Sequence, residues 1–475
     1  MQVTLSTDLA DQLRRECGED VSLCYQCRKC SSGCPLAESF DLAPSQLIRA
    51  LQFGLTDLVL KSRTIWLCAM CETCASRCPH QINITRIIDV LRIAAQREGI
   101  APAVPAVLNF YQAANRSIRW FGRMYEAGMM GEFYLRQLLG RELDYRQLAR
   151  RDLPAAWKMV RQGKLKLLPH RGNPRTKDRA GGKDGIMAYY PGCSLRGTAM
   201  EYDLSTRAIL RKLEIPFEEP DNWGCCGSTP AHSTDHFLAT LNPLKNLSMV
   251  HARGHRRLTT PCPSCFVRTK TAQQDMETDP VLRARVAAEI PNFSPGDLQV
   301  EHLLNSLYRL LDLSALAGRI VRHFRDMPVV CYYGCLITRP PVITGEEDYE
   351  YPRKMDRIVQ ALGMKPLDWS YKTRCCGATH AVTSPRLGLE LTARILRNAK
   401  LVGARAIVVA CPLCQVNLDA RQGQVNDEFG EDFHLPVLYF TQLIGWALGL
   451  QGDALGMDRH FVQPASLLQE LPGGQ

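Results

Sequence analysis

The sequence lacks the long apolar runs that would let a chain cross or enter a membrane. The longest apolar stretches, such as residues 406–410, are far too short to span a bilayer, and residues 1–11 show no charged-then-apolar secretion pattern. It also lacks a G-x-G-x-x-G motif after a predicted strand, so binding of flavin or nicotinamide is left to a partner. We therefore expect a protein with no membrane span and no nucleotide-binding fold of its own.

The composition is that of an ordinary folded protein with many cysteines. The chain has 475 residues, of which 45% are hydrophobic and 22% charged, enough for about three domains with separate cores. Twenty cysteines without a secretion signal indicate a reducing compartment and metal ligation in place of disulfides. The expected location is the cytoplasm.

The net charge of +10 could suggest nucleic-acid binding. However, an oxidised cubane cluster with four thiolates carries about −2, which would offset much of that excess. The remaining basic residues are concentrated locally, since residues 158–183 hold nine Lys or Arg and no aromatic residue after Trp157. This composition favours a solvated linker or a partner-docking strip, and no nucleic-acid site is predicted.

Two cysteine runs near the N-terminus have the x2, x2, x3-Pro spacing of bacterial two-cluster ferredoxins. In those proteins the fourth cysteine of each run ligates the other cluster. The prediction is one 4Fe-4S cubane on Cys24, Cys27, Cys30 and Cys78, and a second on Cys68, Cys71, Cys74 and Cys34. Two zinc sites are the alternative, but zinc does not require this repeated spacing.

Helical periodicity surrounds these runs. Apolar residues recur at helical spacing over 44–58 and again over 84–95, so residues 1–100 should form a helical ferredoxin-like domain. Residues 107–147 also read as helical, within a central region 101–185 that ends in the basic, Gly-rich linker.

The C-terminal part contains a duplicated five-cysteine pattern. Adjacent cysteines are poorly placed to form an ordinary disulfide with each other. Five thiolates also exceed what a tetrahedral zinc or a cubane can use, which implies a larger or distorted iron-sulfur cluster. The two sets are Cys193, Cys225, Cys226, Cys262 and Cys265, then Cys335, Cys375, Cys376, Cys411 and Cys414. Matching positions are offset by 142, 150, 149 and 149 residues, which indicates an internal duplication.

Short predicted strands alternate with helices on both sides of these cysteines. Strands are expected at 186–190, 215–218, 329–333 and 406–410, and helices at 198–213, 238–250, 355–362 and 387–401. The fold class is therefore multidomain α and α/β, with two duplicated α/β domains at 186–321 and 322–475. Ligands at the carboxyl ends of strands fit the usual location of sites in open sheets.

These motifs resemble the heterodisulfide reductase family. Residues 190–450 are similar to the catalytic B subunit, whose two CCG domains each hold a noncubane 4Fe-4S cluster through a C-x31 to x39-CC-x34 to x35-C-x2-C pattern. The gaps here are 31, 35 and 2, then 39, 34 and 2, and the phrases YPGC at 190–193, RCCG at 374–377 and YFTQLIGWALGL at 439–450 add to the match. LCYQC at 23–27 and IWLC at 65–68 are similar to the C subunit. The chain thus resembles a C-then-B fusion.

The resemblance implies a disulfide oxidoreductase with two cubane and two noncubane 4Fe-4S clusters, the ten CCG cysteines being catalytic. Electrons would come from a flavin-containing A-type subunit, with hydrogenase or formate dehydrogenase components as further partners. The disulfide would be a small thiol carrier or a sulfur-carrier protein, and the reaction could run in either direction. His232 and His380, shortly after the two cysteine doublets, could supply protons, or they could be structural.

Two other functions remain open. CCG domains also occur in electron-transfer subunits of glycolate, lactate and glycerol-3-phosphate dehydrogenases, although two complete cysteine sets count against that interpretation. A scaffold with structural zinc explains neither the fifth cysteine nor the duplication. Cys17 and Cys331 lie outside both patterns, as a surface or helix cysteine and a buried core thiol respectively.

Overall fold

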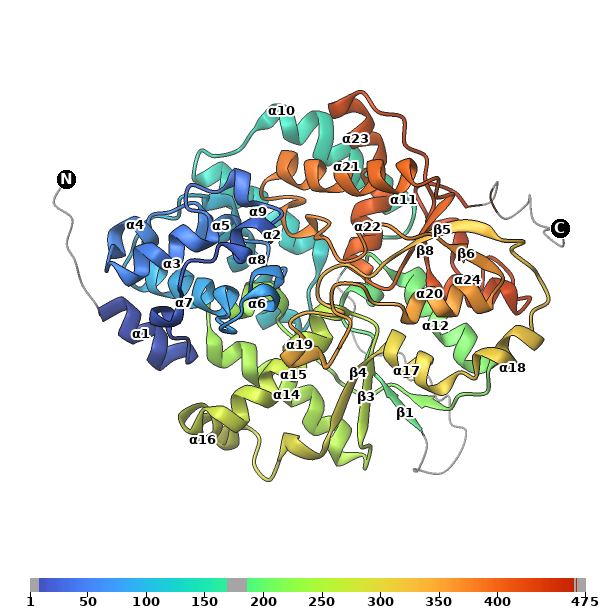
Figure 1. The fold of residues 1–475 in the computed structure, drawn as a ribbon, viewed down its shortest axis with the longest axis horizontal. Coiled ribbons are helices and arrows are strands. Elements are labelled where there is room, and N and C mark those ends of the chain that lie inside the picture. Colours follow the sequence, from blue (N-terminus) through green and yellow to red (C-terminus); the bar gives the residue numbers. More distant parts are fainter. Residues whose placement is uncertain (1–7, 169–185, 465–466, 468–475) are drawn as a thin grey trace.

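The computed structural model describes residues 8–168, 186–464 and 467. Its N-terminal part is helical, as predicted (Figure 1). The longer helices are α1 (Asp8–Cys17), α3 (Pro44–Gln52) and α7 (Ile84–Arg97). Shorter helices are η1 (Val21–Leu23), α2 (Lys29–Gly33), η2 (Ala37–Ser39), α4 (Thr56–Leu60), α5 (Thr64–Leu67) and α6 (Thr73–Arg77). Their apolar faces form a single core that includes Leu47, Trp66 and Leu91.

The central region is helical but is not one helix. The stretch predicted at 107–147 forms α8 (Pro105–Phe121), α9 (Glu126–Leu139) and α10 (Tyr145–Gln147). Gly122, with a φ of 69°, ends α8 in a left-handed conformation and lets the chain turn back. A π turn (Leu148–Asp152) and α11 (Leu153–Arg161) follow. Most of the predicted basic linker, residues 169–185, lies outside the described residues.

The first α/β unit has a four-stranded parallel sheet. Its strands are β1 (Met187–Tyr189), β2 (Phe217–Glu218), β3 (Arg257–Thr260) and β4 (Gln299–His302), in the order β2-β1-β3-β4. The helices of this part of the chain are η4 (Ser194–Arg196), α12 (Met200–Lys212), α13 (Ser228–His232), α14 (His236–Ala252), α15 (Pro263–Thr278), α16 (Pro280–Glu289), η5 (Pro295–Asp297), α17 (Leu303–Leu310) and α18 (Leu313–Gly318).

The second unit repeats this topology. Its sheet has β5 (Met327–Tyr332), β6 (Met364–Pro366), β7 (Ala406–Val409) and β8 (Val437–Tyr439), in the order β6-β5-β7-β8 and all parallel. Its helices are α19 (Pro341–Thr344), α20 (Lys354–Ala361), η6 (Ala378–His380), α21 (Pro385–Leu401), α22 (Pro412–Ala420), α23 (Gln422–Phe429), α24 (Phe440–Ala447) and η7 (Met457–Arg459). The equal strand order supports the predicted duplication.

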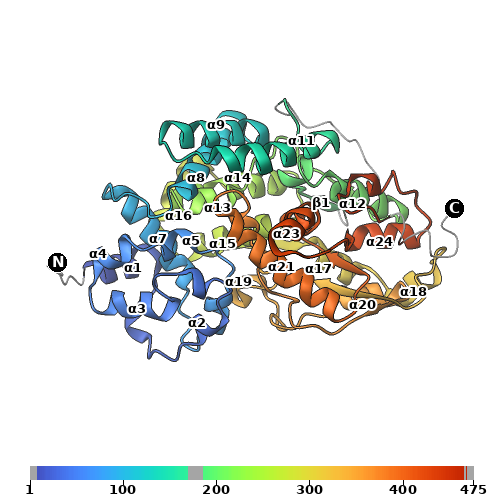
Figure 2. The same ribbon diagram turned by 90° about the horizontal axis from the view of Figure 1, so that it is seen from above.

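The parts are packed closely together. Helices α8, α9 and α11 lie along the first α/β unit, and the N-terminal part occupies one end of the molecule (Figures 1 and 2). Helix α12 of the first unit packs into the core of the second, where Tyr202 stacks on Tyr439 with ring centroids 4.1 Å apart. The predicted fold class is confirmed.

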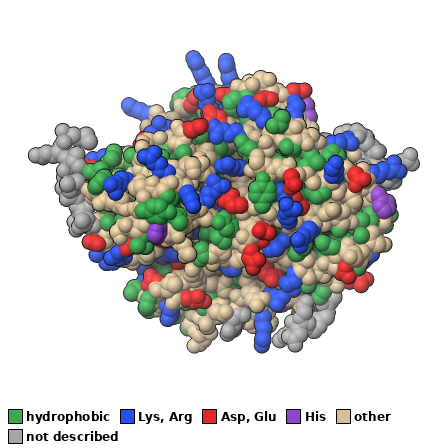
Figure 3. Space-filling model, viewed as in Figure 1, with side chains coloured by type: hydrophobic (Ala, Val, Ile, Leu, Met, Phe, Trp, Pro, Cys, Tyr) green, Lys and Arg blue, Asp and Glu red, His purple; other side chains and the backbone are tan. Residues whose placement is uncertain are grey.

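The surface is mixed in charge. On the face in Figure 3, Lys and Arg side chains are interspersed with acidic and apolar ones. In the described part of the chain no helix has the length and apolar character needed to cross a membrane.

Candidate iron-sulfur site

The two N-terminal cysteine runs have the same local conformation. In each run the residue before the second cysteine and the one after it are left-handed: Gln26 and Arg28 have φ of 63°, and Met70 and Glu72 have φ of 55° and 59°. Arg28 and Glu72 are the residues immediately before α2 and α6. The sharp turns wrap each loop around its own cysteines, as ligands of one central group require.

The structure also brings the fourth cysteine of each run to the other run. Burial, and then the nearby Cys71 thiol, raise the pKa of Cys34, and Cys68 contributes further. Cys27, Cys78 and Cys24 all lie close enough to Tyr25 to act electrostatically on its hydroxyl group. The fourth cysteine of each run therefore lies near the first three cysteines of the other run, as the exchange of ligands requires. The ligand assignment itself stays a prediction.

The five cysteines of each CCG set come together at the carboxyl end of their sheet. In the first set the sulfurs of Cys226 and Cys265 lie 3.4 Å apart, and the equivalent Cys376 and Cys414 lie 3.6 Å apart. The first cysteine of each doublet accepts a 3.4 Å hydrogen bond from the following glycine N–H. The other cysteines lie beside these sulfurs in the same order in both sets: Cys193 and Cys262 lie beside Cys225 and Cys265, and Cys335 and Cys411 lie beside Cys375 and Cys414.

Each CCG site depends on a glycine that approaches a ligand closely. A Cβ built on Gly192 would lie 3.0 Å from Cys265 Sγ, and one on Gly334 would lie 3.0 Å from Cys414 Sγ. Both glycines also have left-handed φ values of 76° and 71°. A side chain at either position would push a ligand sulfur out of place.

The donor set fits iron-sulfur clusters better than zinc. The donors in each CCG site are all thiols, and the doublets are at most 6% exposed. Five thiols, four of them buried in each set, suit a group with several thiophilic metal centres.

The sites form a connected series. Leu36, Ala69, Cys71, Cys375 and Leu391 share one small core, with Cys34 and Cys335 packed against it. This core joins the second N-terminal run to the second CCG site. Cys262 of the first CCG site is in turn close enough to raise the pKa of Cys411 in the second, after larger effects from Cys414 and burial.

The two predicted histidines have different surroundings. His232 Nδ1 lies 2.6 Å from an Asp89 carboxylate oxygen on α7, and burial lowers the pKa of His232 while Asp89 opposes that shift. His380 is 1% exposed, burial lowers its pKa to about 4, and neither ring nitrogen has a hydrogen-bond partner among the described residues. Only His232 is placed beside a carboxylate that could exchange a proton with it.

Sequence reasoning did not find Asp89 or Arg92. Arg92 is fully buried, and its guanidinium donates hydrogen bonds to the carbonyls of Ile65 and Cys68 and to Ser233 Oγ. It thereby joins the second cysteine run to the helix that carries His232. On the sequence both residues look like ordinary polar positions of a surface helix, so no pattern distinguishes them.

Comparison with protein families follows this division of the chain. The family described as "4Fe-4S dicluster domain" matches residues 20–82, and the family described as "Cysteine-rich domain" (CCG) matches residues 187–269 and 329–419. These matches indicate 4Fe-4S clusters in both the N-terminal and the C-terminal part, which confirms the predicted type of cofactor.

Individual relatives cover the two parts separately. The B subunit of the ferredoxin/F(420)H(2)-dependent CoB-CoM heterodisulfide reductase of Methanosarcina acetivorans is 29% identical over 60% of this chain and 96% of its own. The 8-methylmenaquinol:fumarate reductase membrane anchor subunit of Wolinella succinogenes is 27% identical over 59% of this chain and 98% of its own. An iron-sulfur C subunit of the CoB–CoM heterodisulfide reductase of Methanocaldococcus jannaschii is 42% identical over 18% of this chain and 48% of its own. The chain thus spans about half the length of that relative.

The fold and the cysteine sites define an iron-sulfur protein in which a dicluster domain precedes two cysteine-rich domains. Relatives of the heterodisulfide reductase C and B types match these two parts in that order. The chain is accordingly similar to a heterodisulfide reductase C subunit in its N-terminal part and to a B subunit in its C-terminal part.

Proposed function

We propose that the chain is the catalytic and electron-transfer subunit of a heterodisulfide reductase-like complex, which reduces or reversibly forms a disulfide. The observation that carries this proposal is the pair of equivalent five-thiol sites within one packed body. Reduction of a disulfide takes two electrons and two protons and yields two thiols. Bound iron-sulfur clusters supply one-electron transfer.

The cysteines divide into entry and reaction sites in this proposal. Cubane one would use Cys24, Cys27, Cys30 and Cys78, and cubane two Cys68, Cys71, Cys74 and Cys34. The two noncubane clusters would use the ten CCG cysteines. The position of Cys71 in one core with Cys375 supports an arrangement in which the N-terminal part faces the second CCG site.

Protons would be handled on the side of the first CCG domain. Asp89 holds His232 through Nδ1, which orients the ring and opposes the lowering of the His232 pKa by burial. His380 is also buried, but no carboxylate among the described residues acts on its ring. We therefore assign proton donation to His232 and a structural role to His380.

The partners follow from the resemblance and from the kind of site. A flavin-containing A-type subunit would deliver electrons, with hydrogenase or formate dehydrogenase components as further members of the complex. The substrate would be a small thiol carrier or a sulfur-carrier protein, and the twenty cysteines favour the cytoplasm. We also propose domain boundaries near residues 100, 185 and 321. The first and the last fall between helices or strands, and residue 185 lies outside the described residues.

The test is iron and acid-labile sulfide per chain after purification without oxygen, followed by a disulfide assay with a reduced viologen dye. About 16 irons and disulfide-dependent oxidation of the dye would support the proposal. About 8 irons in fully reconstituted protein, with CCG cysteines free or bound to zinc, would leave an electron-transfer or structural subunit. A full iron content without oxidation by any disulfide would favour the electron-transfer alternative.

A further inference from the structure

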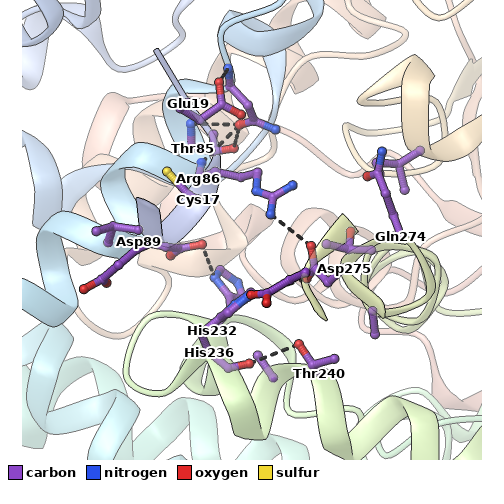
Figure 4. Close-up of a pocket in the computed structure, with 18 of the residues that line it drawn as sticks. Cys17, Glu19, Thr85, Arg86, Asp89, His232, His236, Thr240, Gln274 and Asp275 are labelled. Carbon is purple, nitrogen blue, oxygen red and sulfur yellow. Dashed lines mark hydrogen bonds and ion pairs between the residues drawn. The ribbon is translucent and has the colours of Figure 1, made fainter. Parts of the chain in front are cut away.

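A large cavity lies where the N-terminal part meets the first CCG domain. Its volume is about 1240 Å³, and α7 on one side and α13 to α16 on the other contribute to its walls. Charged side chains on these walls are paired with one another: Arg86 donates a 2.9 Å hydrogen bond to Asp275, and His232 points toward Asp89 (Figure 4). These pairs join the two parts of the molecule across the cavity.

The exposed apolar side chains of the molecule gather elsewhere, on the central region. Of the 22 large hydrophobic side chains that are exposed in the described part of the chain, ten lie within residues 120–168, which make up about a tenth of the sequence. Exposed apolar side chains scattered one by one are normal, whereas a concentration of them marks a surface that binds something.

Helix α9 carries the main part of this surface. Its exposed positions recur three or four residues apart and none of them is charged: Gly128, Gly131, Leu135, Leu138 and Leu139. Met129 and Phe133, on the opposite side of the helix, are buried in a core shared with Ala113 and Ala114 of α8. A surface helix normally turns charged or polar residues to water, so this stripe has the pattern of a face that is covered when the protein acts.

The surface continues beyond the start of α9. A Cβ built on Gly128 would lie 2.5 Å from the Tyr125 ring, so this ring covers Gly128, and the Tyr125 hydroxyl donates a hydrogen bond to the Leu167 carbonyl. The Phe121 ring lies against Tyr125, with ring centroids 5.5 Å apart. We call the resulting surface the apolar face, which consists of Phe121, Tyr125, Leu135, Leu138, Leu139 and Leu167.

The charge around the apolar face is strongly positive. Residues 105–168 hold twelve Lys or Arg and five Asp or Glu, an excess of seven positive charges. Acidic side chains of this segment are used within the protein, since Glu132 pairs with Arg116 and Arg136 between α8 and α9, and Asp144 caps α10. Several exposed arginines, by contrast, form no ion pair within the described residues: Arg119, Arg141, Arg146, Arg150 and Arg161.

We propose that the apolar face binds the surface of an anionic phospholipid bilayer. Its leucine and aromatic side chains would enter the boundary between the headgroups and the acyl chains, as those of interfacial helices do. The arginines around it would contact lipid phosphates, and each cation near an anionic membrane surface strengthens binding.

Two other occupants fit these observations less well. A second copy of the chain would bring like charges together, since both surfaces would carry the same excess of arginine. A protein partner is usually anchored by side chains that fill pockets. The cavity at the edge of the apolar face, to whose lining Phe121, Tyr125 and Leu168 contribute, holds only about 30 Å³. A bilayer surface needs no such pocket.

The test is co-sedimentation of the anaerobically purified, cluster-loaded chain with lipid vesicles. Vesicles with equal parts of phosphatidylcholine and phosphatidylglycerol should bind the chain at least about tenfold more tightly than vesicles of phosphatidylcholine alone, and this binding should weaken as salt is raised. No binding to the anionic vesicles, or equal binding to both kinds, would overturn the proposal. The assay involves no turnover, so its result is independent of the proposed disulfide chemistry.

Single substitutions locate the contact. Leu139→Gln should weaken binding to the anionic vesicles by about tenfold, because one leucine side chain no longer enters the apolar layer. Arg141→Gln should weaken it by about fivefold and reduce its salt dependence. Leu401→Gln is the matched control, because Leu401 is 82% exposed, close to the 75% of Leu139, but lies on α21 outside the apolar face.

Two results would contradict this location. Equal vesicle binding by the Leu139→Gln and Leu401→Gln variants would refute the assignment to the apolar face. If the chain does not bind vesicles and Leu139→Gln instead changes its elution volume in size-exclusion chromatography, the apolar face joins protein chains and the lipid proposal is wrong.

Discussion

Replacing Arg92 with methionine tests how firmly the cluster-bearing parts are joined. Arg92 is fully buried and donates to Ile65 O at 2.6 Å, Cys68 O at 2.9 Å and Ser233 Oγ at 2.8 Å. Methionine keeps the aliphatic volume but leaves these acceptors without their donor. It also removes the cation 3.8 Å from Asp89.

The expected cost is about 4 kcal/mol, because loss of one member of a buried charged network leaves the others desolvated and unpaired. If all 475 residues unfold as one unit, the unfolding entropy per residue converts this to a fall of about 4 °C in Tm. If the N-terminal part unfolds as a separate unit of about 100 residues, the same energy lowers its Tm by roughly 20 °C. The size of the shift thus also reports how cooperatively the parts unfold.

The assay is anaerobic scanning calorimetry of the cluster-loaded protein at one fixed scan rate. Arg97→Met is the control, because the Arg97 side chain is 62% exposed and its ion pair with Glu16 should contribute at most about 1 kcal/mol. If Arg92→Met melts at the same temperature as Arg97→Met, the idea that Arg92 joins the second cysteine run to the first CCG domain is refuted.

Three further changes have definite expected outcomes. Gly192→Ala should displace Cys265 Sγ and lower the iron content by about four irons per chain. Gly403→Ala is the control, because Gly403 also has a left-handed φ of 79° but no atom lies within 4 Å of its Cβ position, so this variant should keep its iron. Equal iron content in both variants would contradict the close-contact argument. Cys34→Ser should alter the electron paramagnetic resonance signal of the cubane on the 68–74 loop, and a change confined to the 24–30 loop would disprove the exchange of ligands. Burial raises the pKa of Glu126 from 4.5 to about 7, so the folded state holds this proton at pH values where the unfolded chain has lost it. The free energy of unfolding should therefore fall by up to about 3 kcal/mol as the pH rises from 4.5 to 7. Glu126→Gln should therefore raise Tm at pH 8 and leave it unchanged at pH 4.5; an equal effect at both pH values would exclude this titration.

The cysteine spacing predicted the two-part organisation, because the number of residues between two cysteines limits which cluster a loop can hold. The duplication then predicted two sheets of one design, and the observed strand orders agree. Strands β3, β4, β6 and β8 were not predicted, since each has only three or four residues and such short runs carry little periodicity. The single helical stretch at 107–147 divides at Gly122, where one residue decides the conformation.

The surroundings of the sites could not be predicted from the sequence. His232 was a candidate because it follows a cysteine doublet, but its partner Asp89 lies 143 residues away on another domain. The cavity likewise depends on how α7 and α15 meet, which no local pattern encodes. Chemistry carried by neighbouring residues is visible in the sequence, whereas chemistry assembled across domains becomes visible only in three dimensions.

The N-terminal part is held to the second CCG domain by the shared core around Cys71 and Cys375 and by an Arg77–Glu350 ion pair. If these parts were separate subunits, they would dissociate on dilution unless the affinity of this contact were high. In one chain the contact is intramolecular, so its effective concentration is set by the tether and does not depend on protein abundance. The fusion therefore fixes a one-to-one ratio of the two parts, and the contact surface can be modest without the pair ever coming apart in a dilute cell extract.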